Sequence, residues 1–386
     1  MIIYDLTSLQ SQKTAPAHGG GKFAEIVFNR LLERDIEIYA FYDSNRNIKE
    51  CILDKIKSNN IKLFDINDIT IADIVKQVEH PLIFSILPQI SFLVTKTIGT
   101  IHDCRESCIP CDFMRFYLNF HFGDIKEYFF QKFFPGFLRN RRINRHLQLI
   151  KNPNFIPTTI TQFTKYTLFN LYKDDTMLDI PIFMTPSYYK PYRDVSALKD
   201  EKFVLMVSAN RWIKNPVRAI KAMDELFDIP QLKEYKFVVV GLGSSKEVKI
   251  NIRNIENFIF KNYVSEEELE ELYKNCTCLL FPSLYEGFGM PPLEAMCYGK
   301  PVVASSLSAI PEVCREGALY IDPFSIDDIK CKLSCLLLDH AQYEVYSRAS
   351  LQRFICIYKE QEKDLDDYID YVLKIDYESY CAETGK

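Results

Sequence analysis

Two glutamates, Glu286 and Glu294, are separated by seven residues in a segment that also holds glycines and prolines. Gly287 and Gly289 have no Cβ, so the backbone there can turn sharply and approach a ligand closely. The pair Pro291-Pro292 suits the first turn of a helix, where a missing N–H costs nothing. The segment therefore predicts a helix N-terminus that binds phosphate, with carboxylates on each side for sugar hydroxyls. This pattern is typical of a nucleotide-sugar site; the alternative is an ordinary loop with two surface glutamates.

A second segment supplies cations. Residues 208–215, Ser-Ala-Asn-Arg-Trp-Ile-Lys-Asn, follow a predicted strand at 203–207. Arg211 offers a bidentate fork and Lys214 a point charge, and both suit a diphosphate. The alternative is a solvated basic loop.

The two glutamates, together with the following Ala-Met-Cys-Tyr-Gly-Lys-Pro-Val-Val-Ala and Ile310-Pro-Glu-Val, resemble the retaining glycosyltransferases of family 4, which have the GT-B fold. The resemblance implies that Glu286 contacts the transferred sugar and that Glu294 holds the nucleotide ribose. Residues 208–215 look like the family's Arg…Lys-Asn signature, although Asn210 stands where glycine is frequent.

Further donor contacts follow from the same resemblance. Residues 260–265 resemble the family's Gly-Tyr/Phe-Val-Ser segment near the base, with Asn262 in the glycine position; Tyr263 could equally belong to the core. Gly241-Leu-Gly243 resembles a turn near the nucleotide. The expected donor-binding residues are Glu294, Gly287, Phe288, Gly289, Leu293, Tyr263, Val264 and Gly241.

The first half of the chain offers two further candidates. His102 follows a predicted strand and resembles the family's His-Asp beside the transferred sugar, although a lone histidine can also be structural. Its position at a strand's carboxyl end favours a ligand contact. The run Gly19-Gly20-Gly21 opens a predicted helix, whose amides suit a phosphate or the acceptor. The expected catalytic set is Glu286, His102, Arg211 and Lys214.

No Asp-x-Asp motif follows a predicted strand, so we expect no metal and no other cofactor, with the NDP-sugar as a substrate. Two other classes stay open. The spacing of Cys104, Cys108 and Cys111 matches the iron–sulfur loop of radical SAM enzymes. A non-catalytic nucleotide-sugar-binding protein would bind the donor without releasing a diphosphate.

Short apolar runs alternate with helical stretches along the chain, a pattern that indicates parallel sheets covered by helices. We expect an α/β protein of GT-B type: two Rossmann-like, doubly wound domains that face each other across a cleft. The predicted limits are residues 1–190 for acceptor binding and 191–365 for nucleotide-sugar binding. Residues 366–386 are expected to form a helix that packs back on the first domain.

The 386 residues carry a net charge of -5, which predicts no general attraction to nucleic acid. We see neither a signal peptide nor a spanning apolar run. The twelve cysteines then favour reduced thiols and a cytoplasmic location.

Residues 113–147 are rich in phenylalanine and tyrosine and end in a cluster of arginines: Arg139, Arg141, Arg142 and Arg145. This composition suits either a membrane-surface element at the inner face of the cytoplasmic membrane or a domain core. The sequence as a whole predicts transfer of a hexose from a GDP- or UDP-sugar, with GDP-mannose among the candidates. The expected acceptor is a saccharide or lipid-linked saccharide of cell-surface polysaccharide or lipopolysaccharide synthesis.

Overall fold

The computed structural model describes residues 1–10, 19–118, 122–192 and 201–384. These residues form two compact units. The first comprises residues 1–104, 141–188 and 360–386, and the second residues 105–140 and 189–359.

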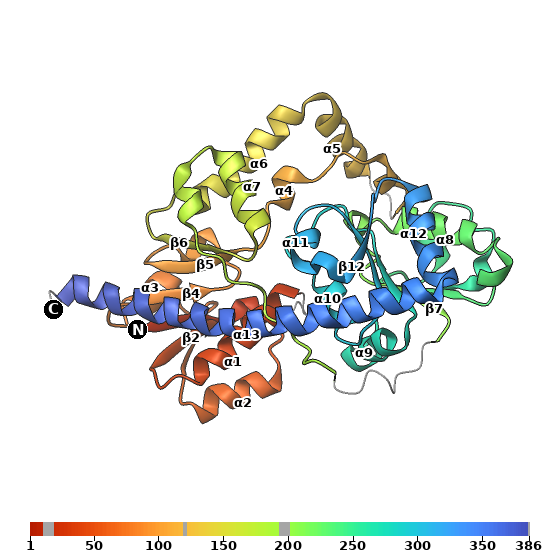
Figure 1. Cartoon of the computed structure of the whole chain (residues 1–386). Helices are drawn as coiled ribbons and strands as arrows, with labels where there is room; N and C mark the ends of the chain where they lie inside the picture. The colour runs from red at the N-terminus through yellow and green to blue at the C-terminus, as the bar shows by residue number, and fades with distance from the viewer. Residues whose placement is uncertain (11–18, 119–121, 193–200, 385–386) are drawn as a thin grey trace. The chain divides into compact units, whose positions relative to one another are not determined.

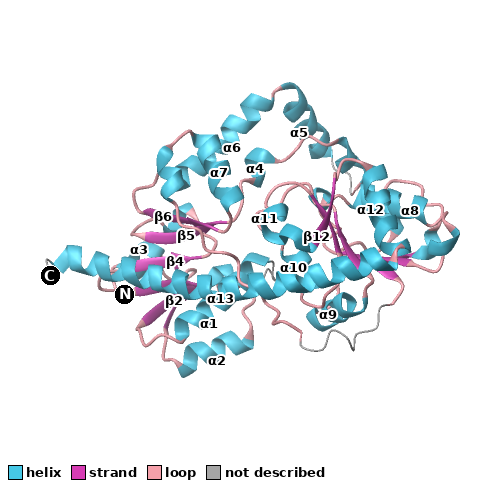
Figure 2. Cartoon of the chain, viewed as in Figure 1, coloured by secondary structure: helices cyan, strands magenta, loops and turns pink. Residues whose placement is uncertain are grey.

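The first unit contains a sheet of six parallel strands within the described ranges (Figures 1 and 2). The strand order is β3-β2-β1-β4-β5-β6, so the chain reverses its direction of winding between β1 and β4. The strands are β1 (Ile2–Asp5), β2 (Ile38–Tyr42), β3 (Lys62–Asp65), β4 (Leu82–Ser85), β5 (Thr97–Ile101) and β6 (Phe155–Thr159). The helices are α1 (Gly19–Leu32), α2 (Glu50–Ser58), α3 (Ile71–Val75) and α7 (Gln162–Tyr172).

The first unit's core shows why its elements pack as they do. Strand β4 is buried along its whole length, as expected for an apolar strand covered on both faces. Helix α1 buries Phe23, Val27 and Phe28 along one stripe. The hydroxyl of Tyr4 in β1 donates to the carbonyl oxygen of Ala24 at 2.7 Å, which fixes the helix against the sheet.

The second unit repeats the architecture with the order β12-β11-β10-β7-β8-β9, again parallel throughout its described strands. The strands are β7 (Phe203–Met206), β8 (Lys236–Val240), β9 (Phe258–Lys261), β10 (Cys278–Phe281), β11 (Val302–Ser305) and β12 (Ala318–Ile321). The helices are α8 (Pro216–Leu226), α9 (Glu266–Asn275), α10 (Met290–Met296), α11 (Ile310–Cys314) and α12 (Ile326–Leu338). The expected α/β fold with two doubly wound parallel sheets is confirmed, whereas a cleft between the units stays a prediction.

Residues 105–140 belong to the second unit, although the predicted limits place them in the first domain. This stretch holds α4 (Arg105–Cys108), α5 (Phe122–Phe133) and the start of α6 (Pro135–Ile150). Two contacts explain the grouping. Arg218 makes a buried bidentate ion pair with Asp112, at 2.6 and 2.9 Å. Leu118 forms an antiparallel bridge with Val248 and lies in the core of the second sheet.

The C-terminal helix is longer than expected. Helix α13 runs without a break from His340 to Thr384, so the predicted limit between residues 365 and 366 marks no element boundary. Its sequence contains no proline or glycine that would end it earlier. Residues 360–384 pack in the first unit, where the Tyr368 hydroxyl lies 2.8 Å from the Thr100 hydroxyl and 3.1 Å from that of Thr158.

Candidate functional site

The segment after β10 forms the predicted turn and helix start. Gly289 has φ = 104° and caps α10, a conformation that favours glycine. The two prolines occupy the first turn of α10, as their missing N–H groups predicted. Gly287, Phe288 and Leu293 are buried, so the segment is packed into the unit and holds its shape.

Lys214 and Glu286 form a buried ion pair, in which the lysine Nζ donates to Oε1 of Glu286. Lys214 ends a short 3-10 helix after β7, and Glu286 lies in the loop after β10. Strands β7 and β10 are neighbours in the sheet, with Leu205 paired to Leu279. The chain changes its direction of winding between these two strands, and open α/β sheets bind ligands at that position beyond the strands' carboxyl ends.

Two serines hold Glu286 in place. The hydroxyl of Ser283, which is fully buried, donates to Oε1 of Glu286 at 2.6 Å. The backbone N–H of Glu286 donates to Oγ of Ser308 at 2.9 Å. These contacts fix both the carboxylate and its backbone before any ligand binds. Neither serine was among the predicted site residues, although Ser283 lies only three residues before Glu286.

Burial lowers the pKa of Lys214, because the charged ammonium loses its water. The Glu286 carboxylate opposes this shift, and the positive charges of Arg211 and Arg105 add to it. Arg211 is exposed and precedes the 3-10 helix that carries Lys214. Three cations therefore act on one position, an arrangement that favours an anionic ligand. Arg105 was not among the predicted residues.

Asn215 explains the Lys-Asn pair in the sequence. It adopts φ = 62°, and its Nδ2 donates to the carbonyl oxygens of Pro282 and Pro323, at 3.2 and 2.7 Å. These bonds tie the lysine loop to the start of the glutamate loop. Arg218 donates to Oδ1 of Asn215 at 3.1 Å and so supports the same junction.

Glu294 lies on α10 with 9% of its surface exposed. Its Oε2 accepts a hydrogen bond of 2.7 Å from the hydroxyl of Tyr273 on α9. Burial raises the pKa of Tyr273, and the carboxylate raises it further, so the tyrosine remains a hydrogen-bond donor. Helix α9 thereby orients the second glutamate.

The predicted base-side residues follow β8 and β9. Gly241 has φ = 110°, and a Cβ there would lie 2.7 Å from the backbone nitrogen of Ala209, so only glycine fits. Tyr263 is 65% exposed, which excludes the core alternative for its ring. Val264 is partly buried beside it. The predicted donor residues thus follow the carboxyl ends of three strands, β10, β8 and β9. Arg211 and Lys214 follow β7, which lies between β10 and β8 in the sheet.

In the first unit, His102 follows β5 and lies at an open pocket of about 230 Å³. Its Nε2 lies 2.8 Å from the carbonyl oxygen of Ile86, which places the proton of a neutral ring on Nε2. The ring also meets Phe23 edge to face at 5.7 Å. Gly19, Gly20 and Gly21 form the first turn of α1, as predicted.

The cysteine interpretation gains no support. Among the residues that the structure describes, no three His, Cys, Asp or Glu side chains gather as a group able to hold a metal ion. Cys104 is buried, Cys108 partly buried and Cys111 exposed. In the same described part of the chain, no helix is both long and apolar enough to cross a membrane.

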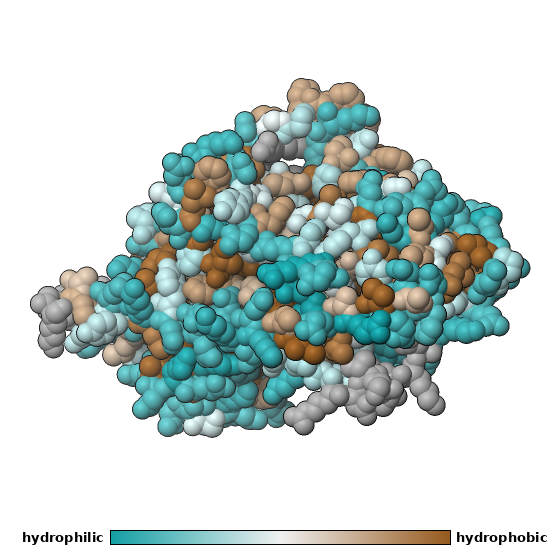
Figure 3. Space-filling view, in the orientation of Figure 1, coloured by the Kyte–Doolittle hydropathy of each residue, from teal (hydrophilic) through white to brown (hydrophobic). Residues whose placement is uncertain are grey.

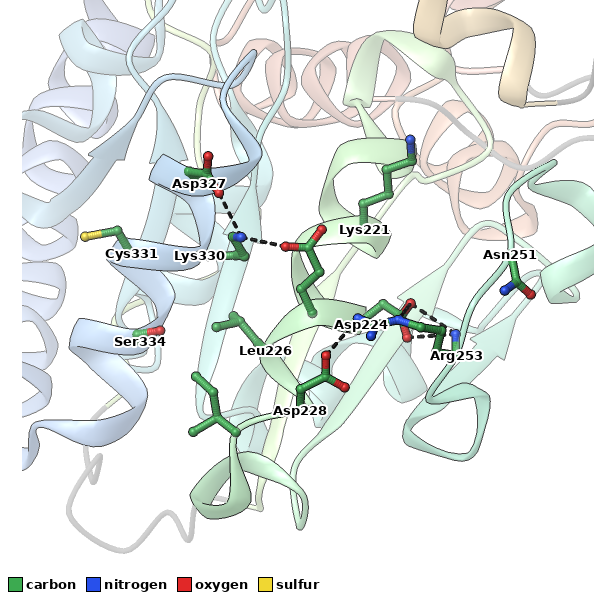
Figure 4. Close-up of a pocket in the computed structure, with 12 residues that line it drawn as sticks. Lys221, Asp224, Leu226, Asp228, Asn251, Arg253, Asp327, Lys330, Cys331 and Ser334 are labelled. Atoms are coloured by element: carbon green, nitrogen blue, oxygen red, sulfur yellow. Dashed lines mark hydrogen bonds and ion pairs between the residues drawn. The ribbon is translucent and has the colours of Figure 1, made fainter.

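A larger open pocket, of about 840 Å³, lies elsewhere in the second unit, between α8 and α12 (Figure 4). No predicted site residue lines it. Most of its charged groups bind one another, because Lys330 pairs with Glu225 and Asp327, and Arg253 pairs with Asp224 and Asp228. We therefore assign the candidate site to the Lys214–Glu286 region, where cations and carboxylates converge, and not to the larger pocket.

Comparison with known proteins agrees with the fold. The structure is similar to that of WaaG, a glycosyltransferase involved in lipopolysaccharide biosynthesis, with a TM-score of 0.64 at 12% identity, over 96% of this chain and 99% of that one. It is also similar to Anabaena HepE in complex with UDP and glucose, with a TM-score of 0.60 at 14% identity, over 95% and 99% of the two chains. These likenesses define a GT-B fold.

Residues 190–353 match the family model of glycosyl transferases group 1. O-antigen chain mannosyltransferase B of Escherichia coli is 38% identical over 92 residues, 24% of each chain. O-antigen chain mannosyltransferase RfbU of Salmonella typhimurium is 38% identical over 80 residues, 21% of this chain and 23% of the relative. The matched regions span about a quarter of these curated relatives.

Proposed function

We propose that this protein is a retaining glycosyltransferase that moves a hexose from an NDP-sugar to a saccharide or lipid-linked saccharide. The observation that supports this most directly is the Lys214–Glu286 pair at the winding reversal of the second sheet. The family match and the mannosyltransferase relatives support the same class of reaction. GDP-mannose is the first donor to test, and UDP-sugars are the second group. The product belongs to cell-surface polysaccharide or lipopolysaccharide.

Transfer of the sugar releases a nucleoside diphosphate, so negative charge grows on the leaving group as the glycosidic bond breaks. Arg211 and Lys214 are the residues that stabilise this charge in our proposal, with Arg105 adding to the local field. When the diphosphate engages Lys214, Glu286 becomes available to accept hydrogen bonds from the transferred sugar. Glu294 holds the ribose, with its orientation set by Tyr273.

Retention would follow from attack on the same face from which the diphosphate departs, assisted by the departing phosphate. In this proposal the acceptor binds the first unit. There His102 contacts the transferred sugar and the amides of Gly19, Gly20 and Gly21 contact the acceptor or a phosphate. We place the reaction at the cytoplasmic face of a membrane, because a lipid-linked acceptor resides there.

We also propose that no metal ion takes part, because Arg211 and Lys214 provide the positive charge that a divalent ion would otherwise supply. Activity should then persist in EDTA. A loss of activity in EDTA that Mg²⁺ or Mn²⁺ restores would contradict this part of the proposal.

The test measures release of nucleoside diphosphate across GDP- and UDP-sugars with a saccharide acceptor, comparing wild type with Glu286→Gln. We expect at least about a hundredfold loss of turnover, the usual consequence of removing a group that acts on the reacting centre. Glu316→Gln, at an exposed glutamate of the same unit, is the matched control. Full activity of the Glu286 variant would refute the site. Donor binding by calorimetry without any diphosphate release would instead identify a non-catalytic binding protein.

A further inference from the structure

Five phenylalanines are exposed around the junction of α5 and α6, where burial would be expected. They are Phe129, Phe130, Phe133, Phe134 and Phe137, and their exposed fractions range from 37% to 64%. We call this set the aromatic surface. Figure 3 shows apolar atoms gathered where α5 and α6 meet, at the top of the view. Large aromatic side chains gathered on a surface usually mark an interaction site.

The aromatic surface is locally ordered. Phe129 and Phe133 stack at 5.7 Å between ring centroids, and Phe130 and Phe134 lie 5.9 Å apart. The N–H of Phe134 still donates to the carbonyl of Phe130 at 2.8 Å, so the helical spacing continues to the end of α5. The rings therefore pack on one another and still expose much of their area. This arrangement answers the question left open by the sequence, because these five side chains do not fill a core.

Basic residues lie close to these phenylalanines in the sequence and on the surface of α5. Lys126 and Lys132 are exposed on α5, and the Nζ of Lys132 lies 6.0 Å from the centre of the Phe133 ring. Residues 122–150 contain six basic and two acidic residues, in a chain whose net charge is -5. One of those acids, Glu127, is bound by Arg115 at 2.8 Å. The predicted arginines Arg139, Arg141, Arg142 and Arg145 contribute to this count, but their side chains lie outside the described residues.

We propose that the aromatic surface docks on an anionic lipid bilayer. Phenylalanine rings partition into the boundary between headgroups and acyl chains, and adjacent lysines meet the lipid phosphates. A second copy of the chain fits less well, because a symmetric contact places the same surface opposite itself and brings like charges together. This inference deepens the proposed function, since a lipid-linked acceptor is reached at a bilayer. Bilayer binding depends on surface residues and is measured separately from catalysis.

The experiment is co-sedimentation of the full chain with vesicles of phosphatidylglycerol and phosphatidylcholine, compared with vesicles of phosphatidylcholine alone. The first variant combines Phe133→Ser, Phe134→Ser and Phe137→Ser, all at exposed positions where folding should be preserved. We expect its affinity for anionic vesicles to fall on the order of a hundredfold, because three apolar contacts are lost. Tyr166→Ser combined with Ile255→Ser removes exposed apolar groups elsewhere and should bind as wild type does.

Charge is tested separately. Lys126→Glu combined with Lys132→Glu should weaken binding to anionic vesicles and make that binding less dependent on salt concentration. Lys246→Glu should have neither effect.

Failure of the wild-type protein to bind anionic vesicles would overturn the proposal, as would binding by the phenylalanine variant that equals that of wild type. A dimer that the phenylalanine variant dissociates, with no vesicle binding, would assign the surface to a second copy. Diphosphate release with a water-soluble acceptor should stay unchanged in every surface variant, which separates this proposal from the catalytic one.

Discussion

Lys214 donates to Glu286 across the two central strands of the second sheet, although 71 residues separate them in the chain. The pair joins the cation of one strand-end loop to the carboxylate of another. Because both side chains are largely buried, each neutralises the other until a ligand takes over one of the contacts.

Breaking the pair should cost stability as well as activity. Lys214→Met leaves Glu286 without its cation, and we expect the free energy of unfolding to fall by about 3 kcal/mol. The double variant Lys214→Met/Glu286→Gln should recover part of that loss, because no isolated charge remains buried. Urea denaturation of the two single variants and of the double variant gives the coupling free energy between the two side chains. Strictly additive losses would show that the two residues do not interact.

The lowered pKa of Lys214 should determine the pH at which activity falls on the alkaline side of the pH–activity profile. In the proposed function, donor binding needs the protonated amine of Lys214, and burial moves the pKa of that amine below its ordinary 10.5. As pH rises, kcat/KM for the donor should therefore fall at a lower pH than an ordinary lysine would give. This parameter reports the ionisation of the free enzyme. Lys214→Arg should move the fall to higher pH, because the guanidinium stays protonated.

The control for that profile is Lys246→Arg, at an exposed lysine of the same unit. Its alkaline limb should coincide with that of wild type. If Lys214→Arg also leaves the limb in place, another group is responsible for it.

Ser283 should act as a positioning residue for Glu286. Its hydroxyl donates to the carboxylate at 2.6 Å from a fully buried position. Ser283→Ala should lower kcat roughly tenfold, since a hydrogen bond to a charged group contributes about 1.5–3 kcal/mol. The KM for the donor should change less, because the diphosphate contacts remain. Ser306→Ala, at an exposed serine of the same unit, should be neutral.

Two further measurements on Ser283 separate positioning from folding. Ser283→Thr keeps the hydroxyl and should restore part of the activity. A loss of thermal stability large enough to explain the loss of kcat would assign Ser283 a purely structural role.

Asp112 and Arg218 should hold residues 105–118 against the second sheet. Asp112→Asn removes the charge from a buried bidentate pair, and we expect about 3 kcal/mol less stability. Amide hydrogen exchange should rise first in residues 105–118. The exposed pair of Asp73 and Lys76 is the comparison, and Asp73→Asn should change stability little. A rise in amide hydrogen exchange that is uniform throughout the chain of the Asp112→Asn variant would contradict a local role for Asp112.

Much of the donor region could be predicted because its signals are local. Gly289 and the two prolines of α10 act on their immediate neighbours, and they form the predicted turn and helix start. Gly241 is a partial case: the strand and turn were predicted, but its close approach to Ala209 appears only when β7 and β8 pair.

Prediction from the sequence was incomplete where contacts between distant segments, and not the local residue pattern, decide the structure. Residues 105–140 follow the first sheet in sequence, yet the buried pair of Asp112 and Arg218 assigns them to the second unit. Tyr263 could not be classed as core or surface from its neighbours, because its burial depends on what packs over the loop after β9. Helix α13 is longer than predicted, and the N-terminal half that was not assigned to it buries Phe354 and Ile357.

The sequence by itself determined the residue types of the donor region and the α/β pattern that orders them, because strands, turns and helix starts depend on nearby residues. Only the tertiary structure decided that Lys214 meets Glu286, that Ser283 and Tyr273 hold the two carboxylates, and that the phenylalanines of α5 face outward. These outcomes depend on strand order and burial. Both are set by packing between segments that lie far apart in the chain, which no local pattern specifies.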